Sequence, residues 1–234
     1  GLLHLDRFST PFLFAALLGL IVLFIVMKWL KNTTRIHKFT TQKVRLRFSF
    51  SNYFIILLVI SFVIQFVVTL FETVFSIYGK DELAFNSNQV GIGFMLCGSV
   101  MAILQPIFAS YGEKVLSSKN QIALGLLISG ASLIAFPFFK SEFMIYGLII
   151  LFAAGGAMVT PNLLSAVSLL SKTNTGRNIS IQSSTNSIGQ ILGPVLGTWL
   201  VTGGFYYPFI VAGIIVLIAI SFLFFLKNPY RHKK

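Results

Sequence analysis

The stretch TLFETVFSIY, residues 69–78, places one carboxylate, Glu72, inside a long apolar segment that spans residues 53–78. The other acidic residues lie in connecting segments. If the segment crosses a membrane, Glu72 lies roughly 9 Å from its Tyr78 end, in the outer half of the span. A carboxylate at the centre of a bilayer costs at least about 2.5 kcal/mol, so an intramembrane acid calls for a function. The chemistry available to it is proton exchange with the outside or attraction of a cationic substrate.

Further polar side chains share the helical face of Glu72. At about 100° per residue, five polar groups lie within roughly 80° of arc, and we call them the polar stripe. The stripe consists of Ser61, Gln65, Thr69, Glu72 and Ser76. Phe62 and Phe66 lie beside it, where they would offer aromatic faces to a flat or cationic ligand. We therefore expect the stripe to face a cavity or the interior of a bundle.

Two alternatives for Glu72 need no ligand. Its side chain would extend outward to water, or hydrogen-bond to Thr69 or Thr73. It could also face lipid or the interface without any role.

A second polar line has four-residue spacing near the C-terminus. It consists of Gln182, Asn186 and Gln190, with Ser183 and Ser187 one position further on. Uncharged amides serve equally to join helices and to line a cavity. Asn162, next to Pro161, more simply joins helices.

The composition indicates the elements that must position these groups. Of 234 residues, 56% are hydrophobic and 10% are charged, against about 25% charged in soluble domains. The formal charge of +12 is divided among short clusters between apolar segments, which favours a membrane protein over a nucleic-acid partner. One cysteine and three histidines near connections give no metal site and no catalytic triad. No phosphate-binding loop is present, so neither a cofactor nor an enzyme is indicated.

Seven apolar segments have the length that a spanning helix needs, about 20 residues, or nearly so. They are residues 11–28, 53–78, 90–111, 121–139, 143–170, 180–201 and 208–226, the sixth being the least apolar. We predict an all-α membrane protein with seven transmembrane helices. Alternate loops and the C-terminus hold 15 of the 18 basic residues, and the opposite set holds only Arg7, Lys80 and Lys140. Positive charge marks the cytoplasmic side, so we expect Gly1 outside and the C-terminus in the cytoplasm of a multi-pass cell-membrane protein.

The first and last segments resemble each other. Residues 6–32 and 202–228 both carry Pro-Phe, a pair of small residues and a closing Lys-Asn. This repeat predicts that each segment closes one half of a two-fold repeated protein, and that further helices precede Gly1. The alternatives are chance similarity between apolar helices and a true seven-helix protein that starts outside.

This layout resembles the major facilitator superfamily, whose six-helix halves are joined by a basic cytoplasmic loop. The resemblance implies the last helix of the N-terminal half (1–28), a central loop (29–52), a six-helix C-terminal half (53–226) and a basic tail (227–234). The segment GQILGPVLGTW, with Gly189, Gly193, Pro194 and Gly197, is similar to a motif of drug antiporters, although Thr198 replaces the final Gly.

Other motifs are similar to parts of the same family. Glu113 and Lys114 occupy a decayed copy of the family's cytoplasmic gating loop, and Pro161 lies in a small-residue helix. FETVFSIY resembles the corresponding helix of quinolone-type and tetracycline-type multidrug:proton antiporters, where the resemblance implies a coupling or drug-binding role for Glu72. Some relatives carry a second acid in the helix that matches residues 143–170, and this sequence has none there.

We therefore expect a fragment of a secondary-active transporter that exports amphipathic or cationic drugs against protons. Its partners would be the lipid bilayer, small amphipathic substrates, protons and the missing N-terminal half. The alternatives are a metabolite or sugar transporter of the same superfamily, a seven-helix receptor and, less strongly, a non-transporting assembly protein.

Overall fold

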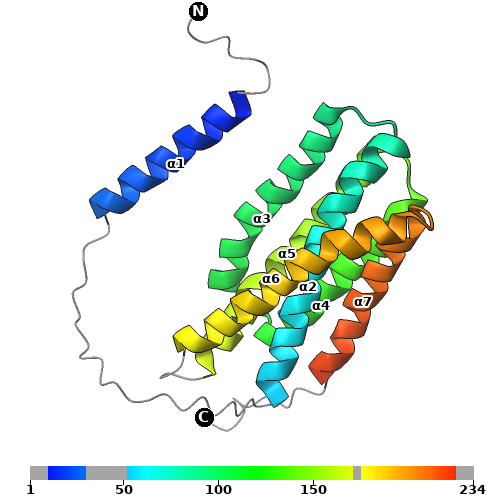
Figure 1. Ribbon diagram of the computed structural model, residues 1–234. Helices are drawn as coiled ribbons and strands as arrows, with labels where there is room; N and C mark the ends of the chain where they lie inside the picture. The colour runs from blue at the N-terminus through cyan, green and yellow to red at the C-terminus, as the bar shows by residue number, and fades with distance from the viewer. Residues whose placement is uncertain (1–9, 30–51, 171–174, 225–234) are drawn as a thin grey trace, which may run out of the picture. The chain divides into compact units, whose positions relative to one another are not determined.

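The computed structural model describes residues 10–29, 52–170 and 175–224, and all regular structure there is helical. The seven predicted helices are confirmed (Figure 1). They are α1 (Thr10–Trp29), α2 (Asn52–Asp81), α3 (Ser87–Val115), α4 (Ser118–Ala135), α5 (Glu142–Leu169), α6 (Thr175–Val201) and α7 (Tyr206–Phe224), with a short 3₁₀ turn, η1 (Phe136–Phe138), after α4. Helix α1 forms one compact unit by itself, and α2 to α7 form the other.

Six of the described helices are long and apolar enough to cross a membrane, and α6 is the exception. Its 27 residues would extend about 40 Å, so its length suffices and its polar content sets it apart. Helix α6 makes its main contact with α2, where Gln182 is buried against Ser61, whereas several of its other polar residues stay exposed.

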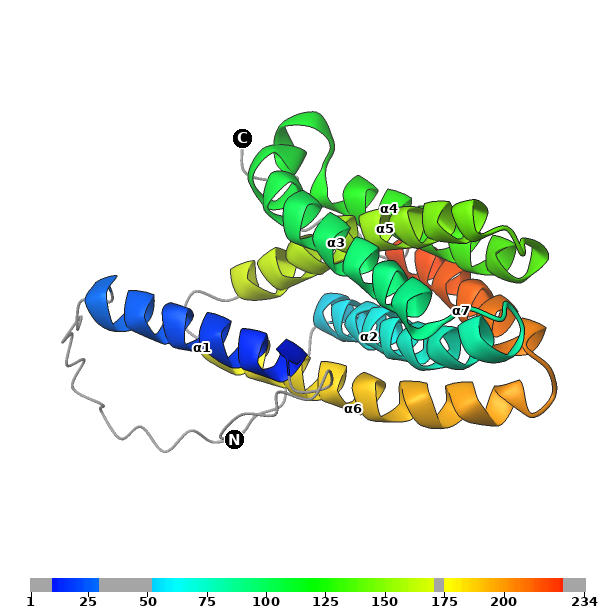
Figure 2. The same ribbon diagram turned by 90° about the horizontal axis from the view of Figure 1, so that it is seen from above.

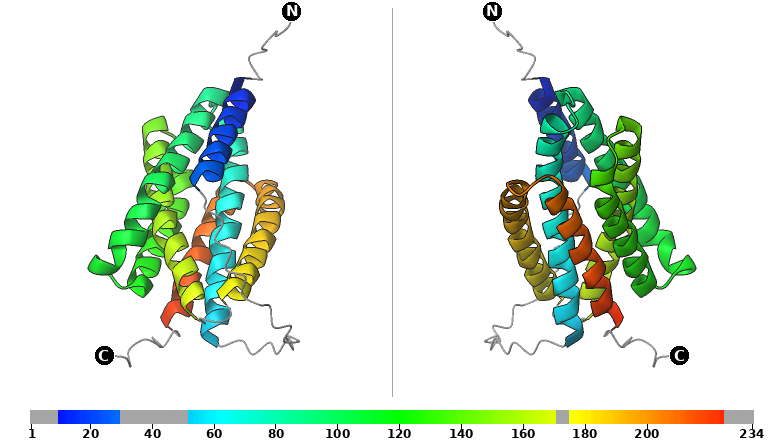
Figure 3. Two further views of the ribbon diagram at one scale, coloured as in Figure 1. Left: turned by 90° about the vertical axis from the view of Figure 1, so that its left-hand side faces the viewer. Right: turned by 90° about the vertical axis from the view of Figure 1, so that its right-hand side faces the viewer.

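Helix α2 lies between α6 and the group formed by α3, α4 and α5 (Figure 2). Helices α3 and α4 both pack on α5, and α4 also packs on α7. Helix α6 lies on the side of the bundle away from α3 and α4 (Figure 3). The amino ends of α2, α4 and α6 therefore share one end of the bundle with the carboxyl ends of α3, α5 and α7; we call this the basic end, and the opposite one the outer end.

Aromatic side chains fill the core toward the outer end. Phe71 of α2 has its ring centroid 4.7 Å from that of Phe152 on α5, and Phe136 lies 4.8 Å from Phe209 on α7. Such large side chains contribute much of the packing energy between these helices. The core thus places α2 at the centre of the bundle. The polar stripe of α2 is exposed only where no neighbouring helix covers it.

Short connections are fixed by local residues. Asn86 and Gln89 form a capping box at the start of α3, each side chain accepting from the other's backbone N–H. Gly204 has φ +133°, a conformation that suits glycine, in the turn from α6 to α7. The connection from α3 to α4 is only Leu116 and Ser117, because α3 continues to Val115, four residues beyond the predicted end of its segment.

Candidate functional site

The polar stripe passes from a buried position at the basic end of α2 to an exposed one near the outer end. Ser61 is 4% exposed, Gln65 and Thr69 are half-buried, and Glu72 and Ser76 are exposed. The expectation that the stripe faces the bundle interior therefore holds for its first part only.

The crossing of α6 over α2 explains this change. Gly189 lies against Phe62 and Phe66, Gly193 against Phe66 and Thr69, and Gly197 against Leu70 and Val74. On a helical projection with Gln65 at zero, the contact of α6 moves around α2 from roughly 60° at Phe62 to roughly 180° at Val74, away from Glu72 near roughly −20°. Glu72 is thus uncovered by the same packing that buries Ser61.

Small residues allow this crossing to be close. A Cβ atom added at Gly193 would lie 2.5 Å from the Phe66 carbonyl oxygen and would also meet the Thr69 hydroxyl. A Cβ at Gly189 would lie 2.9 Å from the Phe62 carbonyl oxygen. Such distances leave no room for a methyl group, so backbone meets backbone along this seam. Pro194 lies in the same helix, about two turns before its last residue, Val201.

Glu72 has no hydrogen bond or ion pair with any described residue. The alternative in which it binds a neighbouring threonine is wrong, because both hydroxyls are directed to the backbone. Thr69 Oγ1 donates to the Gln65 carbonyl at 3.0 Å, and Thr73 Oγ1 donates to the Thr69 carbonyl at 2.9 Å. Cys97, buried on α3, lies within electrostatic range of Glu72. The carboxylate is therefore free to meet a proton or a cation from outside the bundle.

The amide line on α6 divides between two faces. Gln182 is 5% exposed and its Nε2 donates to Ser61 Oγ at 2.9 Å, which joins α6 to the polar stripe. Asn186 is half-buried one turn further on. Gln190 is exposed, as are Ser183 and Ser187, so these residues belong to a different face from the glycine seam.

Two acceptors on this line lack donors. The side-chain oxygens of Gln182 and Asn186 are buried and have no hydrogen-bond partner among the described residues. A buried acceptor without a donor costs about 1–3 kcal/mol, so the contact of α2 with α6 is not fully satisfied in this conformation.

The aromatic pair beside the stripe is also divided. Phe62 and Phe66 are stacked with centroids 5.9 Å apart. Phe66 is 4% exposed and belongs to the core, whereas Phe62 is half-buried. Only Phe62 presents part of its ring outside the packed interior.

Asn162 of α5 joins helices, as predicted, through a second buried polar pair, whose other member, Gln121 of α4, was not predicted from the sequence. Asn162 Nδ2 donates to Gln121 Oε1 at 3.0 Å and to the Met158 carbonyl at 2.7 Å. Pro161 has no N–H, so the Ala157 carbonyl lacks its helical donor. Asn162 bonds the next carbonyl along the chain, that of Met158. The signal in the sequence was present, since both residues are amides within apolar segments, but the contact joins positions 41 residues apart.

Residues Glu113 and Lys114 lie in the last turn of α3 and not in a loop. Their side chains lie outside the description, so a gating role stays a prediction. No group of three or more histidine, cysteine or acidic side chains that could hold a metal occurs among the described residues.

Comparison with known proteins places these features in a family context. A model described as the Major Facilitator Superfamily matches residues 57–234. The chain is 25% identical over 236 residues to the tetracycline resistance protein, class B, of Escherichia coli, covering 92% of this chain and 57% of that protein. It is 25% identical over 221 residues to multidrug resistance protein 2 of Bacillus subtilis (strain 168), covering 90% and 55%. The chain thus spans about half the length of these curated relatives.

Proposed function

Because the chain belongs to the major facilitator superfamily, we propose that it is part of a carrier that exports amphipathic or cationic compounds in exchange for protons. Residues 53–226 would form the C-terminal half and α1 would close the N-terminal half, with residues 29–52 as the central loop. The start of α1 would lie outside the cell and the C-terminus in the cytoplasm. Transport would proceed by alternating access, as this half moves against the other.

The observation that carries the proposal is the uncovered carboxylate. Glu72 is exposed on the central helix of an otherwise apolar bundle and has no partner among the described residues. A charge left open on a membrane helix would face water or another protein surface, since lipid disfavours it. The relatives named for tetracycline and multidrug resistance support drug export as the use of that surface.

The other residues take supporting roles. Ser61, Gln65, Gln182 and Asn186 would contribute polar lining at the basic end, and Thr69, Ser76 and Gln190 would do so nearer the outer end. Phe62 would be the aromatic wall, with Phe66 holding it from behind. Gly189, Gly193, Gly197, Pro194 and Pro161 would set the helix shapes, and Glu113 with Lys114 would act at the basic end.

The test is dye or drug export by the full-length protein with Glu72→Gln, at several external pH values. The proposal expects wild-type export to depend on the pH gradient, and the variant to lose that dependence along with at least about tenfold of its rate. Glu142→Gln, which changes an exposed acid at the outer end, is the matched control and should keep both. A Glu72→Gln protein with the wild-type rate and pH response would remove Glu72 from the mechanism.

A further inference from the structure

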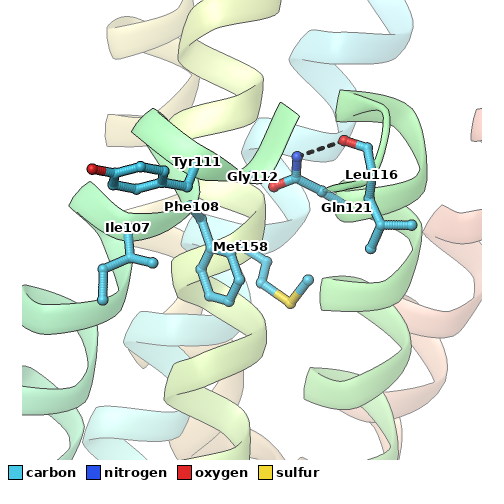
Figure 4. A pocket seen from close by; sticks show the side chains of 7 residues that line it. All are labelled: Ile107, Phe108, Tyr111, Gly112, Leu116, Gln121 and Met158. Atoms are coloured by element: carbon cyan, nitrogen blue, oxygen red, sulfur yellow. Dashed lines mark hydrogen bonds between the residues drawn. The ribbon is translucent and has the colours of Figure 1, made fainter. Parts of the chain in front are cut away.

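A cavity of about 170 Å³ lies between α3, α4 and α5 near the basic end (Figure 4). Helices α3 and α4 pack on α5 and scarcely on each other, so α5 forms the floor of the space between them. Its wall includes Ile107, Phe108, Tyr111, Leu116, Gln121 and Met158. Apolar cavities of about 150 Å³ hold a group the size of benzene.

Apart from the Tyr111 hydroxyl, the wall has one polar side chain, Gln121, and its amide group is hydrogen-bonded within the protein. Gln121 Nε2 donates to the Leu116 carbonyl at 2.9 Å, and Gln121 Oε1 accepts from Asn162. Neither the nitrogen nor the oxygen of the Gln121 amide is available to a ligand, so the rest of the wall surface is hydrocarbon and thioether. The chemistry of the wall therefore suits an alkyl or aromatic group, and it gives water too few partners.

The cavity is separate from the candidate transport site. Phe75 of α2 lies against Gly93 of α3, which puts Glu72, nearly one turn earlier on the antiparallel α2, at about the level of Cys97. Ile107 is ten residues further along α3. At 1.5 Å per residue this is a separation of about 15 Å along the helix axis. A small substrate bound at Glu72 would not reach the cavity.

The mouth of the cavity lies at the depth of lipid head groups. Tyr111 is 61% exposed and lies four residues from the end of α3, about 6 Å along the axis. Tyrosine is enriched at this level of membrane proteins. Ile107, 45% exposed, continues the mouth one turn deeper, where the first methylene groups of a lipid would be.

Charge at the same end favours a lipid with an anionic head group. Lys119 lies in the first turn of α4, between the wall residues Leu116 and Gln121. Among the described residues of α2 to α7, Lys114, Lys119 and Arg177 lie in helices at this end, and Glu113 is the one acid there. Basic residues next to a membrane attract anionic lipids.

We propose that this cavity is a binding site for an anionic phospholipid, with an acyl chain held between α3 and α4 and the head group next to Lys119. The lipid would fill the space that these helices leave open over α5. The site does not depend on the direction or the substrate of transport.

The test is native mass spectrometry of the purified full-length protein with dioleoylphosphatidylglycerol or dioleoylphosphatidylcholine. We expect the wild type to retain phosphatidylglycerol at least tenfold more tightly than phosphatidylcholine. Ile107→Trp fills the cavity and should abolish that retained lipid. Ile103→Trp, one turn away, 61% exposed and outside the cavity wall, is the matched control and should retain it.

Two further variants keep the proposal falsifiable if Ile107→Trp does not fold. Leu116→Trp fills the cavity from its opposite wall and should also lose the lipid, and Lys119→Gln should lose the preference for phosphatidylglycerol while still binding lipid. Equal retention by the wild type and a folded cavity-filling variant would overturn the site. Equal binding of the two lipids by the wild type would overturn the anionic assignment, and displacement of the lipid by a transported dye would assign the cavity to substrate instead.

Discussion

At the residue scale, Gln121 and Asn162 show how two amides stabilise a contact within an apolar bundle. They are 1% and 4% exposed, and the Asn162 side-chain amide donates a hydrogen bond to the Gln121 side-chain oxygen. Replacing one by an apolar residue leaves the other with a buried polar group.

Gln121→Leu is therefore expected to lower the free energy of unfolding by about 1–3 kcal/mol, because the Leu116 carbonyl and the Asn162 amide each lose a partner. Thermal unfolding of the purified full-length protein would measure this. The double variant Gln121→Leu/Asn162→Leu should be less destabilised than the sum of the single variants. Strict additivity would mean that the pair does not interact.

Asn186 gives the opposite expectation. Its buried side-chain oxygen has no donor, so Asn186→Leu should keep or raise the unfolding temperature. Export should nevertheless fall, because the residue is proposed to line the transport path. Ser184→Leu, at an exposed position of the same helix outside the proposed lining, is the control and should leave export unchanged. A loss of stability without a loss of export would assign Asn186 to helix packing alone.

At the element scale, the contact between α2 and α6 is limited by its glycines. Gly193→Ala is expected to cost about 1–3 kcal/mol and to reduce export, since the added methyl meets backbone atoms of α2. Gly147→Ala on α5 is the matched control, because a Cβ there meets nothing within 4 Å. It should be neutral or stabilising by up to about 1 kcal/mol. Thermal unfolding and export assays of both variants separate the two expectations.

The outer connections are joined by a salt bridge whose strength depends on pH. Lys140 Nζ lies 2.8 Å from Glu82 Oε1, and the hydrogen bond with that carboxylate raises the pKa of Lys140 above its ordinary value. A raised pKa in the folded state adds stability that is complete below the ordinary lysine pKa and is lost as pH rises through the folded value. A double-mutant cycle with Lys140→Met and Glu82→Gln should thus show a coupling at pH 7 that is lost as the pH rises through the raised pKa of Lys140. The cycle is read from unfolding midpoints at low salt, and a coupling that persists at the higher pH would contradict the assignment.

Hydropathy was sufficient to predict the helices and insufficient to predict their faces. The seven segments were readable because a spanning helix must be apolar over most of its length, and α6 was recognised as the weakest. The division of the polar stripe at Thr69 was not readable, because it depends on the path of α6 across α2. Likewise, Gln190 continues the spacing of Gln182 and Asn186 in sequence, but the glycine seam, at positions 189, 193 and 197, sets which of them is buried.

At the scale of the whole molecule, α2 to α7 form one compact unit whose outer end is held by several contacts. Gln89 Nε2 donates to Glu142 Oε2 at 2.8 Å. The Tyr146 hydroxyl lies within hydrogen-bond distance of two acceptors, the Gln89 carbonyl oxygen at 3.0 Å and Glu142 Oε1 at 2.9 Å. These bonds connect the start of α3 to the start of α5. We expect the unit to move as one body during transport.

Distances between pairs of spin labels, measured by double electron–electron resonance in the full-length protein, test this expectation. Spin labels at Ser141 and Thr202, in a Cys97→Ala background, should keep one distance distribution with and without substrate and at low and high pH. A second label pair that joins this unit to the rest of the protein should change under the same conditions. A shift of the Ser141–Thr202 distance as large as that of the second pair would exclude rigid motion.

The glycine seam between α2 and α6 also has a consequence for evolution. A position where even a methyl group is rejected offers selection almost no viable single substitutions, so the seam is a region of low mutational tolerance. New substrate ranges would then arise by exchange of the residues beside it, such as Phe62 and Asn186, which vary without separating the backbones. In a directed-evolution library of the full-length protein, resistant clones should accumulate changes at those flanking positions and keep Gly193 intact.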